Sequence, residues 1–379
     1  MKEETGKRLV VLGALIPTSS RDENDAVIRL HTEIGKISAY EIDYVKLKAE
    51  RIWRIGRYFG EATCTTVRYQ NHRITIISYS FIARYHPLRA LFSWMSVRGF
   101  VKCKRVMSSV ERGALIHAYG LFPAGFIARK MKEYGCEYVL NLRYEIEELH
   151  RNPFGVAELI ITGAKSIVTP SPRVAELVKN KYNRYASVIE HGVDKPSEVP
   201  NDYDVSRFVV LTVARFTKIK RIVEHIVAIR DFIEEDDNNE YWIVGDGPEM
   251  GRIKEAAAGV RGRVIVRGWR EGAELSKLYA SAHIFYLVSI KETFGRVYQE
   301  ALAHGVPVVA TAYSGFYENY DTNKYVVGLE GLERKVVTSI MKNIKDQIHS
   351  GAISRSAVAN TLARYRWQDV AHRYKSILE

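Results

Sequence analysis

The sequence predicts an α/β protein with mainly parallel sheets, organised as two domains. Short apolar runs typical of buried strands alternate with segments of helical periodicity along most of the chain. A length of 379 residues exceeds the usual size of one domain. A polar, proline-containing stretch near the middle separates two such alternating series. Strand–helix alternation of this kind is typical of parallel sheets covered by helices on both faces.

The first series predicts a domain over residues 1–190. Its apolar runs predict strands at 9–15, 73–78, 114–118, 138–142 and 166–169. Helices are expected at 26–35, 123–134 and 172–181, the second of them because Pro123 is suited to a first helical turn.

The stretch 191–206 is predicted to be a linker, because His191-Gly-Val-Asp194 leads into the polar run Lys195-Pro-Ser-Glu-Val-Pro-Asn-Asp. A second domain is predicted over 207–361, followed by a C-terminal helix at 362–379. Its strands are expected at 208–213, 241–244, 264–266, 283–287 and 306–310, and the last helices at 334–349, 353–365 and 367–378.

Composition restricts the class of protein. Apolar residues make up 46%, which is enough for sizeable cores, and no run of 18 apolar residues exists to cross a membrane. The N-terminus leads into a strand without the apolar region of a signal peptide. Cys64, Cys103 and Cys136 are odd in number and lack metal-ligand spacing. We therefore expect a cytoplasmic protein with reduced thiols and no metal site.

The charge distribution indicates an anionic partner. The formal net charge is +12, and the segment 46–112 contains 14 basic residues and 3 acidic ones. Within it, 51–59 interleaves cations with aromatic residues, and 87–105 places apolar residues at helical spacing beside Arg98, Lys102 and Lys104. A basic amphipathic helix of this kind can lie on an anionic membrane, although an ordinary helix with a basic outer face and a nucleic-acid surface remain alternatives.

The most informative motif runs from Ser289 to Thr311. Glu292 and Glu300 stand eight positions apart, around the Phe294-Gly295 turn, between an apolar strand and the run Gly-Val-Pro-Val-Val-Ala. Glu292 is expected in a loop at the carboxyl end of a strand, which is where open parallel sheets bind ligands. Both carboxylates can only accept hydrogen bonds, so they are suited to the hydroxyls of a sugar or a ribose.

This segment resembles the E-x7-E signature of the retaining glycosyltransferases of family 4, the glycosyl transferases group 1. The resemblance implies the GT-B fold: two Rossmann-like domains with parallel sheets facing a cleft, and C-terminal helices that pack back toward the N-terminal domain. It also implies that Glu300 holds ribose hydroxyls. Glu292 would hold sugar hydroxyls together with the backbone of Thr293, Phe294 and Gly295.

A second motif, Ala214-Arg215-Phe-Thr-Lys-Ile-Lys220-Arg221, is similar to the family's G-R-x4-K-G element. There the Arg and Lys grip the donor diphosphate, so Arg215 and Lys220 are expected to stabilise the leaving group. Two cations at the carboxyl end of a strand can neutralise a diphosphate without a metal. Ala214 and Arg221 replace two usual glycines, and the second replacement leaves Lys218 as an alternative to Lys220.

Glycine-rich turns follow two more strands. Trp242-Ile-Val-Gly245-Asp-Gly247-Pro248 resembles the family's V-G-x-G-P turn, and Arg267-Gly268-Trp269 occupies the place where members contact the nucleobase. The resemblance therefore assigns Gly245, Gly247 and Gly268 to donor binding. Glycines here allow a helix or a ligand to approach the sheet closely.

On the acceptor side, His117-Ala-Tyr119-Gly-Leu-Phe-Pro123 resembles the family's H-x-H-x-x-x-P loop, with Tyr119 in place of the second His. His117 is expected to contact the acceptor or the sugar, with a structural histidine as the alternative. Arg143 stands where many members have a His beside the transferred sugar. Arg143 cannot act as a base near neutral pH, but it can hydrogen-bond a sugar or a phosphate.

The resemblance implies a hexosyltransferase that moves a sugar from a nucleotide-diphosphate sugar to an acceptor, without a cofactor or a metal. The expected partners are the nucleotide sugar and a sugar or lipid-linked acceptor such as a polyprenyl-linked glycan. An anionic membrane surface would be contacted through 46–112, with the protein peripheral on the inner face of the membrane. Two alternatives remain: a sugar transferase acting on nucleic acid, and a nucleotide-sugar-binding protein without activity.

Overall fold

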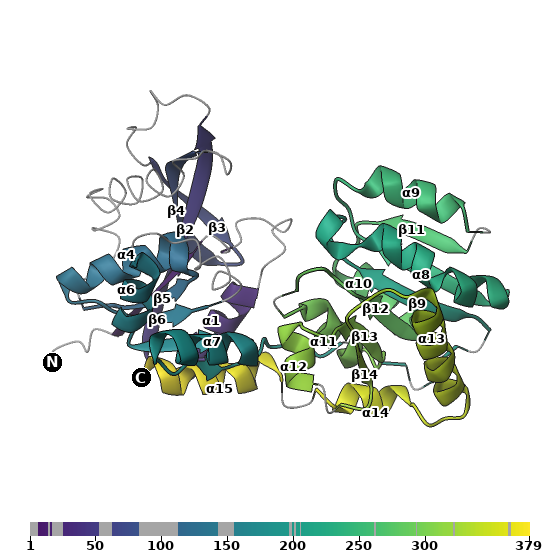
Figure 1. Ribbon diagram of the computed structural model, residues 1–379. Coiled ribbons are helices and arrows are strands. Elements are labelled where there is room, and N and C mark those ends of the chain that lie inside the picture. The colour runs from purple at the N-terminus through teal and green to yellow at the C-terminus, as the bar shows by residue number, and fades with distance from the viewer. Residues whose placement is uncertain are drawn as a thin grey trace. The chain divides into compact units, whose positions relative to one another are not determined.

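The structure is a computed structural model, and it consists of two compact units. It describes residues 7–13, 16, 26–52, 63–82, 113–142, 155–196, 199–200, 202–204, 206–260, 263–292, 294–320, 323–362 and 365–379. The first unit comprises Met1–Gly192 together with Trp367–Glu379, and the second comprises Val193–Arg366 (Figure 1). The chain therefore leaves the first unit once and returns to it with its last helix.

The first unit is built on one eight-stranded sheet in the order β3-β4-β2-β1-β5-β6-β7-β8. All neighbouring strands are parallel except β3 and β4, which form an antiparallel pair at one edge. The strands are β1 (Lys7–Gly13), β2 (Tyr40–Ile52), β3 (Thr63–Tyr69), β4 (His72–Ile82), β5 (Leu115–Tyr119), β6 (Glu137–Asn141), β7 (Ser166–Thr169) and β8 (Ser187–Val188).

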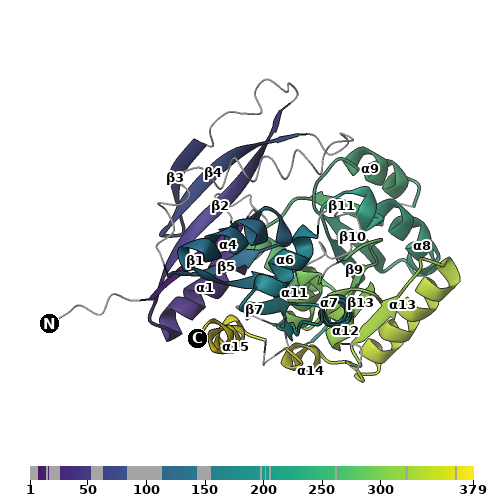
Figure 2. The same ribbon diagram turned by 60° about the vertical axis from the view of Figure 1, so that its left-hand side comes forward.

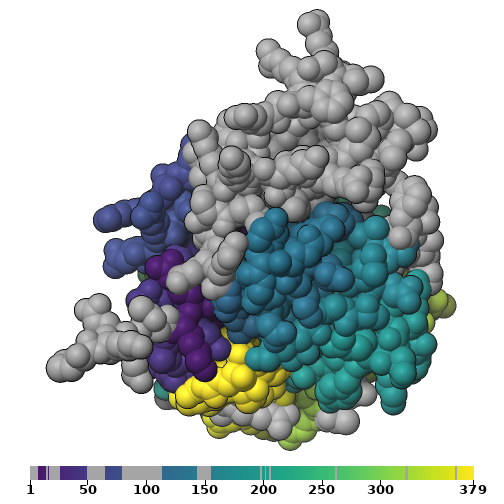
Figure 3. All heavy atoms as spheres, turned by 90° about the vertical axis from the view of Figure 1, so that its left-hand side faces the viewer, coloured from purple at the N-terminus to yellow at the C-terminus, as the bar shows by residue number. Residues whose placement is uncertain are grey.

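Helices cover the sheet of the first unit and bury its apolar strands. They are α1 (Ala26–Ile37), α4 (Phe126–Met131), α6 (Val156–Gly163), α7 (Pro172–Tyr182) and α15 (Trp367–Leu378). The C-terminal helix α15 packs against α1, and both contribute to one apolar cluster with the sheet. Figure 3 shows the C-terminal residues in yellow beside the purple N-terminal segments on this face. The prediction that the C-terminal end of the chain packs back onto the N-terminal domain is therefore confirmed.

The second unit contains a six-stranded, wholly parallel sheet in the order β11-β10-β9-β12-β13-β14. Its strands are β9 (Phe208–Val213), β10 (Asn239–Val244), β11 (Val264–Gly268), β12 (Ile284–Leu287), β13 (Val308–Thr311) and β14 (Val326–Leu329). Numbered from β9, this is the Rossmann order 3-2-1-4-5-6. The direction of strand addition reverses between β9 and β12, so their carboxyl ends mark the place where such sheets bind ligands.

Helices surround this second sheet, and the inner strands β9, β10, β12 and β13 are almost fully buried. They are α8 (Ile222–Glu235), α9 (Met250–Ala258), α10 (Gly272–Ser281), α11 (Arg296–Ala303), α12 (Gly315–Tyr320), α13 (Arg334–His349) and α14 (Arg355–Asn360) (Figure 2). One continuous apolar core joins the sheet to these helices. None of the helices in the described residues is both long enough and apolar enough to cross a membrane.

The structure differs from the sequence expectation in several elements. The strand expected at 73–78 is present as β4, but it pairs with two strands that were not predicted, β2 and β3, on one side of the sheet (Figure 2). The helix expected from Pro123 begins at Phe126, because Leu121–Gly125 forms a separate turn. The helix expected at 353–365 extends only over α14. The expected basic helix at 87–105 lies outside the described residues.

The segment after the first unit packs on the second unit. Val193 pairs with Arg366 in an isolated bridge, and the hydroxyl of Tyr203 donates to the carbonyl of Gly305 at 2.8 Å. The guanidinium of Arg355 lies 4.2 Å from the centre of the Tyr203 ring. Much of the stretch expected as a linker is therefore attached to the second unit.

Candidate functional site

Two loops meet at the carboxyl edge of the second sheet, where the strand order reverses. One follows β9 and the other follows β12, and these strands are neighbours in the sheet. The backbone N–H of Ile290 in the second loop donates to the carbonyl of Ile219 in the first, at 2.8 Å. This bond places the two loops side by side. It therefore brings the cationic residues of the first loop near Glu292 in the second loop.

The side chains of Lys220 and Glu292 form an ion pair between these loops. Only 22% of the Lys220 side chain and 12% of the Glu292 side chain are exposed, so the charges are partly shielded from water. Sequence reasoning left Lys218 and Lys220 as alternatives, and the structure pairs Lys220. Arg221, which follows, has φ +54° in the left-handed region, which explains why a glycine suits this position.

Arg215 lies in the same loop as Lys220, directly after β9, and its side chain is exposed. Its backbone carbonyl accepts a hydrogen bond from the N–H of Thr217 at 2.8 Å, which keeps the loop turned tightly at this point. The loop therefore presents cationic side chains at the edge of the sheet.

The second carboxylate of the motif, Glu300, lies on α11. Its Oε2 accepts a hydrogen bond from the hydroxyl of Tyr279 at 3.2 Å, and Arg296 lies 3.8 Å from its Oε1. Burial raises the pKa of Tyr279 well above 10, so this hydroxyl keeps its proton and acts as the donor. Since a carboxylate has about four acceptor positions, these contacts leave capacity for a ligand. Sequence reasoning missed Tyr279, which the pattern of α10 does not distinguish from a core residue.

The turn between β10 and α9 packs directly against the loop that follows β9. Gly245 has φ +144° and Gly247 has φ +149°. A Cβ atom would lie 1.8 Å from the carbonyl oxygen of Ala214 at the first position and 2.5 Å from that of Phe216 at the second. The N–H of Phe216 also donates to the carbonyl of Asp246 at 2.7 Å. The two glycines are therefore required for the close contact between these loops.

The start of α11 is shaped by Phe294 and Gly295, whereas Thr293 lies outside the described residues. Phe294 is 2% exposed and packs edge-to-face on Phe316, so its side chain belongs to the core. Gly295 has φ +87°, and a Cβ atom there would lie 2.2 Å from the Tyr298 ring. The glycine thus lets α11 begin close to Glu292.

Gly268 ends β11, with φ +68°, and its carbonyl accepts from the N–H of Gly245 at 2.9 Å. This bond joins the two glycine turns that sequence reasoning assigned to the donor. Beside them, the Arg267 guanidinium lies 3.7 Å from the centre of the Trp242 ring, and burial lowers its pKa. Trp269, the next residue after Gly268, is 43% exposed.

A buried histidine contacts the backbone of the loop that follows β12. The ring Nε2 of His225, on α8, lies 3.1 Å from both the backbone N–H and the carbonyl of Val288. Burial lowers the pKa of His225 to about 3, with smaller contributions from Arg221 and Lys220, so the ring is neutral. Sequence reasoning did not assign this residue, because an isolated histidine in an apolar helix face gives no signal of its partner.

In the first unit, His117 on β5 belongs to a buried chain of hydrogen bonds. The ring Nδ1 of His31 donates to the carbonyl of Val27 at 2.7 Å, and its Nε2 lies 2.9 Å from Nδ1 of His117. Burial lowers the pKa of His31 to about 4, so its Nε2 is an acceptor and His117 must donate from Nδ1. A neutral His117 consequently carries its lone pair on Nε2.

Of the residues expected on the acceptor side, the structure describes His117 and Tyr119, and both are buried. His117 is completely buried, and Tyr119 at the end of β5 is 7% exposed with its ring centre 4.6 Å from that of His117. Arg143 lies outside the described residues. Gly13 on β1 faces Tyr119, where a Cβ atom would lie 2.9 Å from the Cβ of Tyr119. The packing of β1 against β5 therefore fixes the side chain of Tyr119.

The site of the second unit combines cations with hydroxyl acceptors. Lys220 and Arg215 provide positive charge for an anion, while Glu292 and Glu300 provide acceptors for hydroxyl groups. In the part of the chain that the structure describes, no three His, Cys, Asp or Glu side chains come together in a way that could hold a metal ion. The arrangement suits a ligand that carries both a phosphate group and several hydroxyls.

Comparison with known proteins finds a family match for most of the second unit. Residues 207–346 match the sequence family described as Glycosyl transferases group 1. The alpha-monoglucosyldiacylglycerol synthase of Streptococcus pneumoniae is 25% identical over 251 residues, which cover 56% of this chain and 55% of that protein. The chain spans about half the length of the curated relatives that it matches.

Solved structures show similarity over the whole chain. Sucrose-phosphate synthase from Thermosynechococcus elongatus superimposes with a TM-score of 0.71 at 16% identity, covering 98% of both chains. The HepE protein of Anabaena, solved in complex with UDP and glucose, superimposes with a TM-score of 0.64 at 17% identity, covering 98% of this chain and 99% of that one. At these identities the likeness establishes the fold. The chain has the GT-B fold, and its residues 207–346 match the glycosyl transferases group 1.

Proposed function

We propose that this protein is a retaining glycosyltransferase that moves a sugar from a nucleoside-diphosphate sugar to a hydroxyl of an acceptor. The observation that carries the proposal is the Lys220–Glu292 pair, which lies at the carboxyl ends of β9 and β12 within the segment that matches the family. A cation for a diphosphate and an acceptor for sugar hydroxyls are in contact there. The neighbour crystallised with UDP and glucose supports this class of donor.

Each side chain has a separate part in the proposed donor complex. Glu300 holds the ribose hydroxyls, in an orientation set by Tyr279 and Arg296. Lys220 and Arg215 hold the diphosphate, and Glu292 turns from Lys220 to the hydroxyls of the sugar. Because the charge on the diphosphate increases as the glycosidic bond breaks, cations at this position stabilise the transition state more than the ground state.

The chemical step conserves the configuration at the anomeric carbon. The acceptor oxygen forms its bond to this carbon on the same face from which the phosphate oxygen departs. The bond between the anomeric carbon and that oxygen breaks, and its electron pair remains on the nucleoside diphosphate. The acceptor's proton passes to the departing phosphate, so no protein base is required, and Arg143 in place of a histidine is compatible with the step.

Turnover by wild-type and variant protein tests the proposal. UDP-glucose and GDP-mannose are suitable first donors, with the release of nucleoside diphosphate as the signal. Lys220→Ala and Arg215→Ala should each lower turnover while binding of the free nucleoside is retained, and EDTA should leave wild-type turnover unchanged. A strict requirement for a divalent ion, or full activity of both variants, would contradict the role given to the two cations.

We further infer an acceptor held at an anionic surface, such as a lipid-linked sugar at a membrane. The excess of basic residues in 46–112 supports this inference, and so does one feature of the strands β3 and β4 at the edge of the first sheet. Arg68 and Arg73 lie opposite each other across β3 and β4, and both are exposed. Like charges in this position are destabilising unless an anion lies nearby. The relative in S. pneumoniae is named as a synthase of a glycosylated diacylglycerol.

Sedimentation with liposomes tests the inference about the acceptor. Wild-type protein should bind vesicles that contain anionic lipid, and binding should fall as salt rises, since charges are screened within about 8–10 Å at physiological ionic strength. Arg68→Glu combined with Arg73→Glu should reduce binding. Lys179→Glu combined with Lys181→Glu, on the exposed face of α7, is the charge-matched control. Competition by RNA for the same variants would favour a nucleic-acid acceptor instead.

A further inference from the structure

A chain of buried hydroxyl groups lies beside the loop that carries Glu292, within the second unit. The hydroxyl of Tyr298, on α11, lies 2.9 Å from the carbonyl oxygen of Leu287 and 3.2 Å from Oγ1 of Thr311. The backbone N–H of Ser289 donates to the same Thr311 oxygen at 2.8 Å. These four residues are completely buried. The chain therefore connects the last residue of β12 with the second residue after it, through side chains of α11 and β13.

The direction of each hydrogen bond follows from its partners. The carbonyl of Leu287 can only accept, so the hydroxyl of Tyr298 donates to it. Because this uses the only proton of the phenol, Thr311 donates to Tyr298, and its own oxygen accepts from the N–H of Ser289. Burial raises the pKa of Tyr298 well above its ordinary value, and the charge of Glu292 raises it further, so the phenol keeps its proton. Every donor in the chain has an acceptor.

The ring of Tyr298 contacts the other end of the same loop. A Cβ atom on Gly295 would lie 2.2 Å from this ring and 3.2 Å from the Cγ of Glu292, so the ring packs against the turn that follows the carboxylate. The hydroxyl of Tyr313 holds the start of the loop a second time, because it donates to the carbonyl of Ser289 at 3.2 Å. The side chain of Tyr298 thus contacts the loop both before and after Glu292.

The hydroxyl of Tyr298 is not needed to fill this part of the core. A phenylalanine occupies nearly the same volume, and a buried hydroxyl is costly unless it forms hydrogen bonds. The hydroxyl instead selects one conformation of the loop, because a displaced segment 287–289 would leave buried donors and acceptors unsatisfied. The position of Glu292 depends on this segment, whereas Glu300 has a contact of its own with α10.

We propose that Tyr298 and Thr311 are positioning residues for sugar transfer, whose hydroxyls hold the loop so that Glu292 meets the hydroxyls of the donor sugar. Both side chains are completely buried, so they act through the loop and not on the ligand. This role rests on the proposed function, in which Glu292 binds the sugar and Glu300 binds the ribose. Loss of either hydroxyl should therefore slow transfer while binding of the free nucleotide is retained.

Release of nucleoside diphosphate by the full-length protein, from UDP-glucose or GDP-mannose, measures transfer. Tyr298→Phe and Thr311→Val each remove one hydroxyl and keep the shape of the side chain. Each should lower kcat/KM for the donor by about tenfold, the order expected when one buried hydrogen bond that positions a reacting group is lost. Thr311→Ser keeps the hydroxyl and should stay close to the wild type. The double variant should lose about as much as either single variant, because both substitutions break the same chain.

Calorimetry with free UDP or GDP provides the readout that a general loss of structure would also move. Affinity for the nucleotide should change by less than about twofold in Tyr298→Phe and Thr311→Val, because Glu300 has separate contacts. A lower kcat/KM at constant nucleotide affinity assigns the defect to the sugar end of the donor.

Tyr241→Phe is the matched control, because it breaks the same kind of buried pair on other strands. The hydroxyl of Tyr241, on β10, lies 2.7 Å from Oγ1 of Thr212 on β9, which donates to the carbonyl of Tyr286 on β12. This pair is bonded to β12 before its last residue, and not to the loop that follows. Tyr241→Phe should therefore lower thermal stability about as much as Tyr298→Phe, but leave kcat/KM unchanged.

The outcomes distinguish the positioning role from the proposed function. If the wild type releases nucleoside diphosphate and both variants keep its kcat/KM, the positioning role is wrong and the proposed function stands. The positioning role is also overturned if nucleotide affinity falls as much as kcat/KM, or if Tyr241→Phe slows transfer equally. If the wild type neither binds nor releases a nucleoside diphosphate, the proposed function fails and the positioning role fails with it. If Thr311→Val does not fold, Tyr298→Phe and Thr311→Ser decide the matter.

Discussion

The sequence motif predicts the position of Glu300 directly, but it does not predict which residues surround this side chain. Its spacing from Glu292 is read directly from the sequence, and Arg296 lies one turn away on the same helix, whereas the contact with Tyr279 depends on how α10 packs beside α11. A carboxylate held by two donors is already oriented for a ligand, which lowers the entropic cost of binding. The sequence motif therefore gives the position of this carboxylate, and the fold supplies its orientation.

Glu300→Gln should weaken binding of free UDP. The substitution keeps the shape of the side chain and removes a charged acceptor, which costs on the order of 1–3 kcal/mol for each charged hydrogen bond lost. Calorimetry with UDP measures this directly. Glu330→Gln, at an exposed position after β14, is the matched control and should bind like the wild type. Unchanged affinity in Glu300→Gln would place the ribose elsewhere.

Glu292→Gln should have the opposite effect on the free nucleotide. Removing the negative charge beside Lys220 frees that cation for a diphosphate, so UDP should bind about two- to fivefold more tightly, as expected for a partly shielded ion pair worth about 0.5–1 kcal/mol. Transfer should nevertheless fall, because the sugar loses a charged acceptor. Lys220→Met should lower UDP affinity, and Glu234→Gln, which breaks an ion pair on α8, is the control. Equal losses of UDP affinity in Glu292→Gln and Lys220→Met would refute the proposed competition.

At the scale of elements, the loops after β9 and β10 are held together by backbone rather than by side chains. The run Gly245-Asp-Gly247 was recognisable in the sequence, but the atom that each glycine faces was not. The strands β2 and β3 were missed for a related reason. Charged and polar residues interrupt the continuous apolar runs by which the central strands were recognised, and both strands pair with β4.

Gly245→Ala should destabilise the second unit. A methyl group would lie 1.8 Å from the Ala214 carbonyl oxygen at a backbone conformation that other residues rarely adopt, which together cost at least about 2–3 kcal/mol. Gly251→Ala is the control, because this glycine lies on α9 with no atom near the added methyl. It should stabilise by about 0.5–1 kcal/mol. Thermal unfolding should show shifts of opposite sign, and a neutral Gly245→Ala would contradict the contact.

At the scale of the whole molecule, each unit buries a neutral histidine. Burial lowers the pKa of His31 in the first unit to about 4, and in the second unit it lowers that of His225 to about 3 and that of His283 to about 4. In the unfolded chain these rings take up protons near pH 6.5. The unfolded state therefore binds more protons than the folded state between about pH 6.5 and pH 4.

Acid should consequently begin to weaken the fold above the pH at which most carboxylates are neutralised. Stability present above about pH 6.5 should fall as the pH drops, by up to about 1.4 kcal/mol per pH unit for each histidine in the window. Urea unfolding at pH 7.5, 6 and 5 measures the slope. His225→Gln should flatten it, while His372→Gln, at an exposed position on α15, should not. If the wild type and both variants showed the same slope, protonation of His225 would not lower the free energy of unfolding, and the expectation would be wrong.

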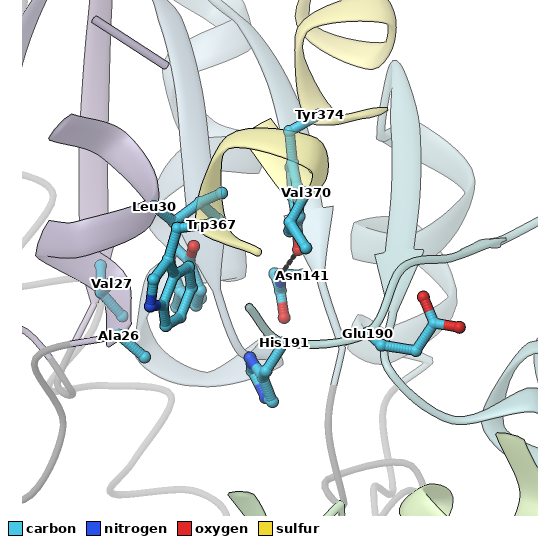
Figure 4. Close-up of a pocket in the computed structure, with 10 residues that line it drawn as sticks. Ala26, Val27, Leu30, Asn141, Glu190, His191, Trp367, Val370 and Tyr374 are labelled. Atoms are coloured by element: carbon cyan, nitrogen blue, oxygen red, sulfur yellow. Dashed lines mark hydrogen bonds between the residues drawn. The ribbon is translucent and has the colours of Figure 1, made fainter. Parts of the chain in front are cut away.

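The two-domain α/β organisation and the C-terminal return could be predicted because they rest on long apolar runs, a polar break and a recognisable motif. Which unit the segment after residue 192 joins could not be predicted. It depends on single contacts, such as Tyr203 with Gly305, between residues about a hundred positions apart. A small pocket at the N-terminal end of α15 was equally unpredictable, since Asn141 and Trp367 line it together only when the last helix packs on the first sheet (Figure 4).

We propose that the site between β9 and β12 transfers a sugar from a nucleoside diphosphate with retention of configuration. NMR of the first product formed from an α-linked donor such as UDP-glucose reports the anomeric configuration of the transferred sugar. We expect an α-linked product, formed by the wild type and reduced in Lys220→Ala. A β-linked product would contradict it.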